Sequence, residues 1–343
     1  MQTIGSNARR DASYTSEIVA SAYAYPSEAV DNAEYLRRCR FELSSSADSL
    51  ALETRMKTRR WCLPHENTAT LTAALVDRLL AQHASVVPEI DAVIVASGTT
   101  MTMAHPSDPK NIAYADLAPL VLRQLGRTEA LGLDIKACYC SGFLRGLQVA
   151  DSLLANPNYR SVLLVAAEQG SRFALAESNR SSFCYIVADA AGGVVLRRGP
   201  PRANVGVVDY CGYTDVSKLD WVGIGEDAAS IIMLGSRAAD ATQGMLLDMA
   251  HTLLARNGLS VRDVDWLLPI QTHAGLLEAV RGKLEWPAEK LLWFGDVNGF
   301  SGSASIPSCF AEQVERGRIE KGQLILSLAV GAGMNCAGAL YYS

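Results

Sequence analysis

Two thiols stand in a short turn between an apolar strand and a helix with apolar periodicity. They are Cys138 and Cys140, within the stretch Leu133–Leu154. A thiol at the start of a helix lies close to free backbone N–H groups and to the positive end of the helix dipole, and both favour the thiolate. Such a thiol suits a covalent intermediate. The alternative is that both cysteines only pack in the core, as most free cysteines do.

Strands and helices alternate around this turn. Apolar runs predict buried strands over 92–97 and 161–167, and leucines at helical spacing predict a helix over 68–84. A first strand is expected over 17–25 and a further helix over 117–125. This alternation is typical of an α/β fold.

The second part of the chain repeats the pattern of the first. Residues 263–270 resemble 89–96, and residues 323–329 resemble 161–167. The segment 291–305 resembles the cysteine turn, with a shared Gly-Phe step and a following helix. Offsets of roughly 160 to 175 residues are too long for a solenoid and suit a duplicated α/β unit. The second copy would face the thiol across a pseudo-twofold axis.

Domain boundaries follow from this repeat. Residues 1–16 are polar and charged and are expected to be a flexible N-terminal segment. The first half, which carries the thiols, is expected over 17–197 and the second half over 198–343. Residues 188–196 are mostly small and apolar, as expected where backbones or a cofactor arm approach closely, and they contain no GxGxxG dinucleotide motif.

Composition excludes several classes of function. The formal net charge is -5 over 343 residues, so no electrostatic footprint for nucleic acid is present. The eight cysteines form no CxxC pair, and we expect no metal site. No apolar run reaches the roughly 18 residues that span a bilayer, and the first residues lack a signal-peptide core. We expect a cytoplasmic protein with reduced thiols.

These features together resemble the β-ketoacyl-acyl-carrier-protein synthase III family of the thiolase superfamily. The segment Cys140–Phe143 is similar to the family's nucleophile turn, Cys-Ala-Gly-Phe. Other similar segments follow in the family's order, namely Thr54–Arg59, Ala188–Gly192, Asp265–Pro269, Ser303–Pro307 and Gly331–Gly333. The resemblance implies a five-layered α-β-α-β-α thiolase-like fold, built from two pseudo-duplicated halves, and a homodimer. It also implies that Cys140 is the acyl-accepting nucleophile and that Cys138 packs in the strand.

Two positions depart from the family's pattern. The family's triad is Cys-His-Asn, and here Ile270 stands where the His is usual and Phe300 where the Asn is usual. Neither side chain can donate a hydrogen bond or carry a proton. In the family these donors stabilise the enolate left by malonyl decarboxylation, and an oxyanion donor is worth about 3 kcal/mol. Ordinary decarboxylative condensation is therefore not expected, unless a register shift brings in Asn298.

The resemblance leaves the acylation step intact. It implies an oxyanion hole made by the backbone N–H groups of Cys140 and Gly333. We expect an acyltransferase that loads an acyl group onto Cys140 and passes it to a second small molecule in polyketide-like or fatty-acid-like biosynthesis. Two alternatives stay open: a decarboxylating synthase with another base, and a non-catalytic partner subunit of a hetero-oligomeric synthase.

Further residues are expected around the acyl site. His273 is a candidate base or pantetheine contact, and His105 a candidate pocket residue. Arg55 and Arg172 match family positions near the coenzyme A nucleotide, although a basic run such as the one that contains Arg55 is more often a solvated surface. The expected substrate-binding set is completed by Ile270, Asn298 and Phe300. No bound cofactor is expected, because the acyl donor arrives on the phosphopantetheine of an acyl carrier protein or of coenzyme A.

Overall fold

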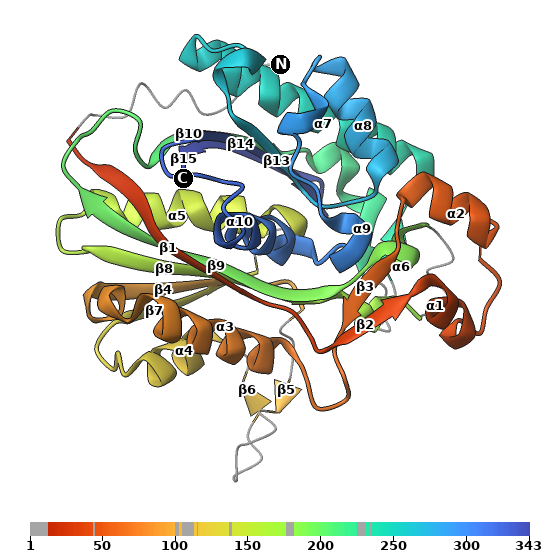
Figure 1. Cartoon of the computed structure of the whole chain (residues 1–343), viewed down its shortest axis with the longest axis horizontal. Coiled ribbons are helices and arrows are strands. Elements are labelled where there is room, and N and C mark those ends of the chain that lie inside the picture. Colours follow the sequence, from red (N-terminus) through yellow and green to blue (C-terminus); the bar gives the residue numbers. More distant parts are fainter. Residues whose placement is uncertain are drawn as a thin grey trace.

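A computed structural model describes residues 13–43, 45–99, 103–104, 113–114, 116–136, 139–175, 182–224, 231–233 and 235–343. Two candidates from the sequence, His105 and Cys138, lie outside these residues. The described residues form two principal β-sheets with helices below, between and above them (Figure 1).

The first sheet contains β7, the strand that precedes the turn with the candidate nucleophile. Its strands are β1 (Thr15–Ala24), β4 (Ile90–Ala96), β7 (Leu131–Ile135), β8 (Ser161–Gln169) and β9 (Asp189–Gly199), in the order β1-β9-β8-β4-β7. Strand β4 runs parallel to β7 and β8, whereas β9 is antiparallel to both of its neighbours. Strands β4 and β8 are covered on both faces, which explains their continuous apolar runs.

The second sheet repeats this topology. Its strands are β10 (Val207–Thr214), β13 (Trp266–Pro269), β14 (Leu324–Gly331) and β15 (Asn335–Tyr342), in the order β10-β15-β14-β13. Strand β13 is parallel to β14, and β15 is antiparallel to both neighbours, as in the first sheet. Leu291 forms a parallel bridge to Leu267 on β13, in the position that β7 takes beside β4. The internal duplication expected from the sequence is therefore confirmed.

Helices complete five layers. The helices are α3 (Thr68–His83), α4 (Ala118–Leu125), α5 (Gly142–Ala155), α7 (Gly235–Asn257), α8 (Ala274–Lys283) and α10 (Ser305–Glu315). Helices α3 and α4 cover the outer face of the first sheet, α5 and α10 lie between the sheets, and α7 covers the second sheet with α8 beside it (Figure 1). The α-β-α-β-α order predicted for this chain is confirmed.

Shorter elements surround one end of the sheets. They are β2 (Glu28–Asp31), α1 (Asn32–Arg38), α2 (Ala47–Thr54), β3 (Thr58–Trp61), β5 (Met103–Ala104), β6 (Ala113–Tyr114), α6 (Ser182–Ile186), β11 (Val222–Ile224), β12 (Ile231–Met233) and α9 (Gly295–Asn298). Helix α2 packs against α6 and α8. Strand β1 already begins at Thr15, so the expected loose segment over 1–16 ends earlier than predicted, and its first twelve residues lie outside the described part.

The two halves meet where β9 passes α10. A Cβ atom on Gly192 would overlap the backbone nitrogen of Ser308 at the start of α10. Only glycine permits this approach, which explains the small residues over 188–196. That segment is therefore shaped by packing between the halves.

Three negative findings concern the described part of the chain. Its seven cysteines are free thiols. Its His, Cys, Asp and Glu side chains form no group of three or more that could hold a metal ion. Within the same ranges, no helix combines the length and apolarity that crossing a bilayer requires.

Candidate active site

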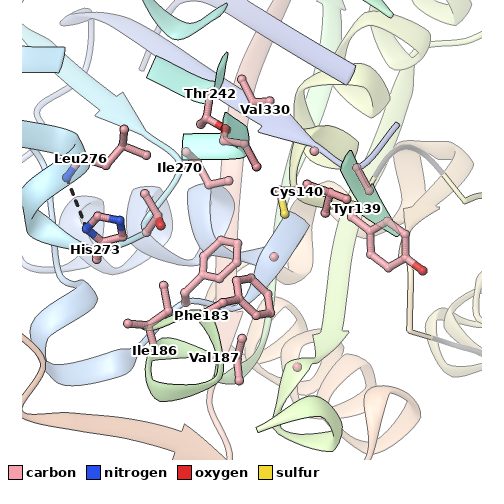
Figure 2. A pocket seen from close by; sticks show the side chains of 18 of the residues that line it. Tyr139, Cys140, Phe183, Ile186, Val187, Thr242, Ile270, His273, Leu276 and Val330 are labelled. Carbon is pink, nitrogen blue, oxygen red and sulfur yellow. Dashed lines mark hydrogen bonds between the residues drawn. The ribbon is translucent and has the colours of Figure 1, made fainter. Parts of the chain in front are cut away.

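A cavity of about 710 Å³ is lined by residues of both halves. The first half contributes Cys140 and Glu168, and the second contributes Ile270, Phe300 and Val330. Apolar side chains form most of the wall, and Figure 2 shows the Cys140 sulfur pointing into the space beside Ile270 and Phe183. The thiol thus shares one cavity with Ile270 and Phe300, the two positions at which the sequence predicted a departure from the pattern of the family it resembles.

A tight turn presents Cys140 to this cavity. The 3-10 turn η2 (Tyr139–Ser141) leads directly into α5, as the sequence pattern predicted. Tyr139 has φ +46°, a left-handed conformation that costs an ordinary residue about 1–3 kcal/mol unless its surroundings enforce it. The surroundings are the neighbouring turn η8 (Gly302–Ala304) and strand β14, against which η2 packs. The position of the thiol is therefore set by both halves.

Burial opposes the ionisation expected for Cys140. Its position at a helix N-terminus predicted a stabilised thiolate, but burial, followed by the charge of the Glu168 carboxylate, raises the pKa of Cys140 to about 12. Loss of hydration disfavours the charged form. Near neutral pH Cys140 is therefore a thiol, and a nucleophilic role requires that it lose its proton.

Glu168 is the functional candidate that sequence reasoning missed. It lies on β8 and is only 2% exposed. Its Oε1 accepts hydrogen bonds from Ser303 Oγ (2.6 Å) and from the Gly98 N–H (2.9 Å), while Oε2 accepts one from Thr99 Oγ1 (2.6 Å). Burial raises the pKa of Glu168, and these donors lower it. The available sequence signal was a single acidic residue at the end of an otherwise apolar buried strand.

Ile270 and Phe300 form an apolar wall in the second half. Ile270 follows β13 directly and donates its N–H to the Leu328 carbonyl on β14 (2.8 Å). Phe300 exchanges backbone hydrogen bonds with Ile186 and Ala188, and its ring meets Phe183 edge to face at 5.8 Å. Both side chains are at least 96% buried and line the cavity. Neither the Ile270 nor the Phe300 side chain can donate a hydrogen bond.

His273 lines another part of the same cavity. It caps the N-terminus of α8, where its Nδ1 accepts the Leu276 N–H at 3.3 Å (Figure 2). Burial lowers the pKa of His273, and Glu53 opposes this shift. A neutral imidazole that accepts at Nδ1 carries its proton on Nε2. His273 therefore suits a hydrogen-bond donor to a substrate carbonyl better than a base.

The turn between β14 and β15 contains the glycine expected in the oxyanion hole. Gly331 and Ala332 line the cavity, whereas Gly333 is not among the lining residues. Gly333 has φ +100°, and Asn335 Nδ2 donates to the Ala332 carbonyl (2.6 Å) to close the turn. The glycine is required for this backbone conformation. The oxyanion role of the Gly333 amide stays a prediction.

Asn298 does not enter the cavity lining. It lies at the end of α9, is 5% exposed, and donates through Nδ2 to Glu312 Oε2 on α10 (3.1 Å). Tyr25 donates its hydroxyl to the same carboxylate oxygen (2.7 Å). The register shift that would have used Asn298 in place of Phe300 is therefore not found, because this amide is part of a packing network.

The arginines expected near a nucleotide flank the cavity without lining it. The Arg55 side chain is 60% exposed and approaches Glu278 at 3.7 Å. Arg172 Nη1 donates to the Thr99 carbonyl at 3.5 Å. Their chain neighbours Glu53 and Gly170 do line the cavity. Each arginine thus follows a lining residue by two positions along the chain, and a role in nucleotide binding stays a prediction.

The basic run over residues 53–60, which contains Arg55, includes both buried and exposed side chains. Arg59 is fully buried, with its guanidinium between the rings of Tyr35 and Tyr185 at 4.9 and 4.7 Å. Its Nη1 donates to the Asp31 carbonyl (3.0 Å). Lys57 is exposed and pairs with Asp296 at 2.8 Å. Arg59 therefore supports the fold, and neither a solvated surface nor a phosphate site describes the whole run.

Comparison with known proteins identifies the family. Models of 3-oxoacyl-[acyl-carrier-protein] synthase III and of its C-terminal region match residues 133–215 and 254–342. A β-ketoacyl-[acyl-carrier-protein] synthase III of Methylococcus capsulatus is 30% identical over 332 residues, which cover 95% of this chain and 98% of the relative. The chain belongs to the synthase III family. A second synthase III, from Xanthomonas campestris, is 31% identical over 263 residues, covering 74% of this chain and 76% of that relative.

Solved synthase III structures share the architecture. The enzyme from Thermus thermophilus superposes with a TM-score of 0.82 at 25% identity, covering 95% of this chain and 99% of that one. The priming β-ketosynthase of the R1128 polyketide pathway superposes with a TM-score of 0.83 at 22% identity, covering 98% of both chains. The second likeness shows the fold alone. The family and fold inferred from the sequence are confirmed, and the family is one of transferases.

Proposed function

We propose that this chain is an acyltransferase in which Cys140 receives an acyl group from a thioester and passes it to a second substrate without decarboxylating malonyl groups. The observation that carries the proposal is the composition of one cavity. A cysteine at the start of α5 shares that cavity with Ile270 and Phe300, at the positions where the family's His and Asn are usual.

The acylation step needs few groups. The Cys140 sulfur attacks the carbonyl carbon of the donor thioester, and backbone N–H groups stabilise the oxyanion that forms. The Cys140 amide and the Ala332 amide are a pair proposed for this role, as an alternative to the predicted Cys140 and Gly333 pair, since Ala332 lines the cavity with Cys140. Release of the donor thiol leaves an acyl-Cys140 thioester in an apolar chamber.

A decarboxylating synthase is less well supported. It would require hydrogen-bond donors beside the thiol to stabilise an enolate. Ile270 and Phe300 offer none, the Asn298 amide is bound to Glu312, and Figure 2 shows His273 on the opposite side of the cavity from Cys140. A non-catalytic subunit is also less well supported, because the thiol and its cavity are retained.

The proposed donor is an acyl chain on the phosphopantetheine of an acyl carrier protein or of coenzyme A. The apolar wall suits an alkyl or aryl chain, and His273 Nε2–H suits an amide carbonyl of the pantetheine arm. Arg55 and Arg172 are proposed to meet phosphate near the edge of the cavity. The expected homodimer and the cytoplasmic location of the protein stay predictions, as does the pathway that it serves.

Intact-protein mass spectrometry tests the proposal. The protein is incubated with acetyl-, octanoyl- and benzoyl-N-acetylcysteamine and with the matching coenzyme A thioesters. We expect an acyl adduct on the wild type and none on Cys140→Ala. Malonyl-N-acetylcysteamine should release no CO₂ above the rate seen with Cys140→Ala. An adduct on Cys140→Ala, or no adduct with any donor, would refute acyl transfer through Cys140, and rapid CO₂ release would refute the non-decarboxylating mechanism.

A further inference from the structure

The Cys140 thiol needs a proton acceptor before it can attack a thioester, and neither Ile270 nor Phe300 can accept a proton. Five ionisable side chains line the cavity within the described part of the chain, namely Glu53, Tyr139, Cys140, Glu168 and His273. They form two groups, because Glu168 acts electrostatically on Cys140 and Tyr139, whereas Glu53 acts on His273. Glu168 is therefore the carboxylate of the group that contains the thiol.

The Glu168 carboxylate is held rigidly at the place where the halves meet. Its donors are the Gly98 N–H and the Thr99 hydroxyl after β4, and the Ser303 hydroxyl of η8 in the second half. Ser303 Oγ also lies 3.2 Å from the Ala96 carbonyl, and Thr99 Oγ1 accepts the Gln169 N–H at 2.8 Å. A carboxylate fixed by donors on several elements is preorganised, as a proton-transfer group must be.

We propose that Glu168 is the general base of acyl transfer at Cys140, taking the place of the absent histidine. The inference rests on the proposed function and adds the residue that moves the proton. It follows from the shared cavity, from the electrostatic coupling of the two side chains and from the lack of a titratable group at positions 270 and 300.

The proton balance closes in both half-reactions. In the first, the S–H bond of Cys140 breaks and its proton passes to Glu168 while the sulfur bonds to the donor carbonyl carbon. The donor C–S bond then breaks, and its sulfur takes the proton from Glu168. In the second, the acceptor X–H gives its proton to Glu168 as X bonds to the acyl carbon. The Cys140 sulfur leaves and regains that proton, so no further reactant is needed.

The alternative role of Glu168 is structural. Its carboxylate accepts hydrogen bonds from the loop after β4 and from η8, and it would act as a clamp between them. A clamp needs hydrogen-bond acceptors but no charge, and glutamine keeps one acceptor oxygen for Gly98 and Ser303 while losing the bond that Thr99 donates. A base needs the ionisable carboxyl group. Charge and shape can therefore be separated by Glu168→Gln. The titratable groups that face Glu168 among the described residues are Tyr139 and Cys140, both on η2.

Glu312 offers a matched control within the same fold. It is also a buried glutamate, 4% exposed, that accepts hydrogen bonds from Tyr25 (2.7 Å) and Asn298 (3.1 Å) and pairs with Arg316. It is not among the cavity-lining residues, and it is not among the groups that shift the pKa of Cys140. Glu312→Gln therefore reports the cost of neutralising a buried carboxylate away from the thiol.

The experiment measures single-turnover acylation of Cys140 by octanoyl-N-acetylcysteamine between pH 6 and 9, with intact-protein mass spectrometry as readout. Alkylation by iodoacetamide and thermal unfolding are followed in parallel. In Glu168→Gln we expect acylation to slow about 100-fold, which is within the range for loss of a general base. Alkylation at pH 8 should become faster, because removal of the negative charge lowers the pKa of Cys140. Glu312→Gln should match the wild type in both rates.

Opposite changes in the two rates cannot come from a clamp that merely loosens. Acylation of Glu168→Gln within threefold of the wild type would overturn the proposal. So would a parallel loss of acylation and alkylation together with a lowered melting temperature. If Glu168→Gln does not fold, Glu168→Asp keeps the charge but withdraws the carboxylate, and it must acylate at least tenfold more slowly at unchanged alkylation. A wild type that accepts no acyl group would instead refute the proposed function itself.

Discussion

The two halves of the chain have the same topology but contribute opposite chemistry to the cavity. The first half supplies a thiol, a carboxylate and a hydroxyl through Cys140, Glu168 and Thr99. At the corresponding edge of the second sheet stand Ile270 and Val330, with Phe300 beside them. Topology is retained in both halves, because the buried strands and the interlayer packing do not depend on these side chains. The architecture therefore does not require reactive side chains at the cavity positions of either half.

The largest expected effect is the pH dependence of the rate at which Cys140 is alkylated. The pKa of Cys140 is raised to about 12, and only the thiolate reacts with iodoacetamide. Below that pH the thiolate fraction rises about tenfold for each pH unit, so alkylation should accelerate about 1,000-fold between pH 7 and 10. Mass spectrometry of the alkylated protein measures the rate, with Cys140→Ala as the background. A plateau of the alkylation rate below pH 8 would show that the helix terminus stabilises the Cys140 thiolate more than burial destabilises it.

A second prediction concerns the apolar wall formed by Ile270 and Phe300. The double variant Ile270→His and Phe300→Asn places donors where the family usually has them. We expect CO₂ release from malonyl-N-acetylcysteamine to rise at least about tenfold, since a single oxyanion donor is worth 10²–10³ in rate when well placed. The double variant Ile270→Leu and Phe300→Leu is the control without donors. Equal rates for both variants would mean that these positions do not limit decarboxylation.

A third prediction concerns the group on the far side of the cavity, His273. Replacement by alanine removes the cap of α8 and should cost about 1 kcal/mol of unfolding free energy. His273→Asn keeps a capping oxygen and should unfold near the wild-type midpoint. Both variants should raise KM for octanoyl-coenzyme A several-fold, with little change in kcat. A KM that stays at the wild-type value in both variants would exclude a contact with the pantetheine arm.

The same residue gives stability a defined pH dependence. Burial lowers the pKa of His273 in the folded protein, so below about pH 6.5 the unfolded chain binds the additional proton. Stability is then lost as the pH falls toward the folded-state value. Denaturant unfolding from pH 5 to 7.5 should show a weaker decline in His273→Asn than in the wild type. An identical pH profile for the two proteins would contradict the assigned shift.

The smallest expected effect on acylation concerns Asn298, a residue outside the cavity lining. Asn298→Ala removes one hydrogen bond to Glu312 and should lower the unfolding free energy by about 1–2 kcal/mol, because a buried carboxylate loses a donor. The acylation rate of Cys140 should stay within twofold of the wild type. If Asn298→Ala loses acylation without losing stability, Asn298 contributes to the active site.

Several features could be read from the sequence with physical reasons. The buried strands β4, β8 and β14 follow from continuous apolar runs, and the duplication follows from the repeated order of those runs. The turn at Cys140 and the helix after it follow from the change of pattern there. The family resemblance, carried by short segments in a fixed order, placed Ile270 and Phe300 opposite the thiol, and both line its cavity.

Other features depended on contacts between distant segments. Glu168 is a single polar residue in an apolar strand, and its partners Gly98 and Ser303 are 70 and 135 residues away. The exclusion of Gly333 from the cavity lining depends on one backbone angle, and the place of Asn298 depends on α10. Local pattern cannot determine such contacts.

Sequence by itself determined the α/β architecture, the duplication and the position of the candidate nucleophile, because periodicity and motif order are local properties of the chain. Tertiary structure decided the protonation of that nucleophile and the group beside it. Burial controls the hydration of Cys140, and loss of hydration disfavours its charged form. Only the packing of β8 against η8, and of η8 against η2, brings Glu168 to the cavity that Cys140 lines.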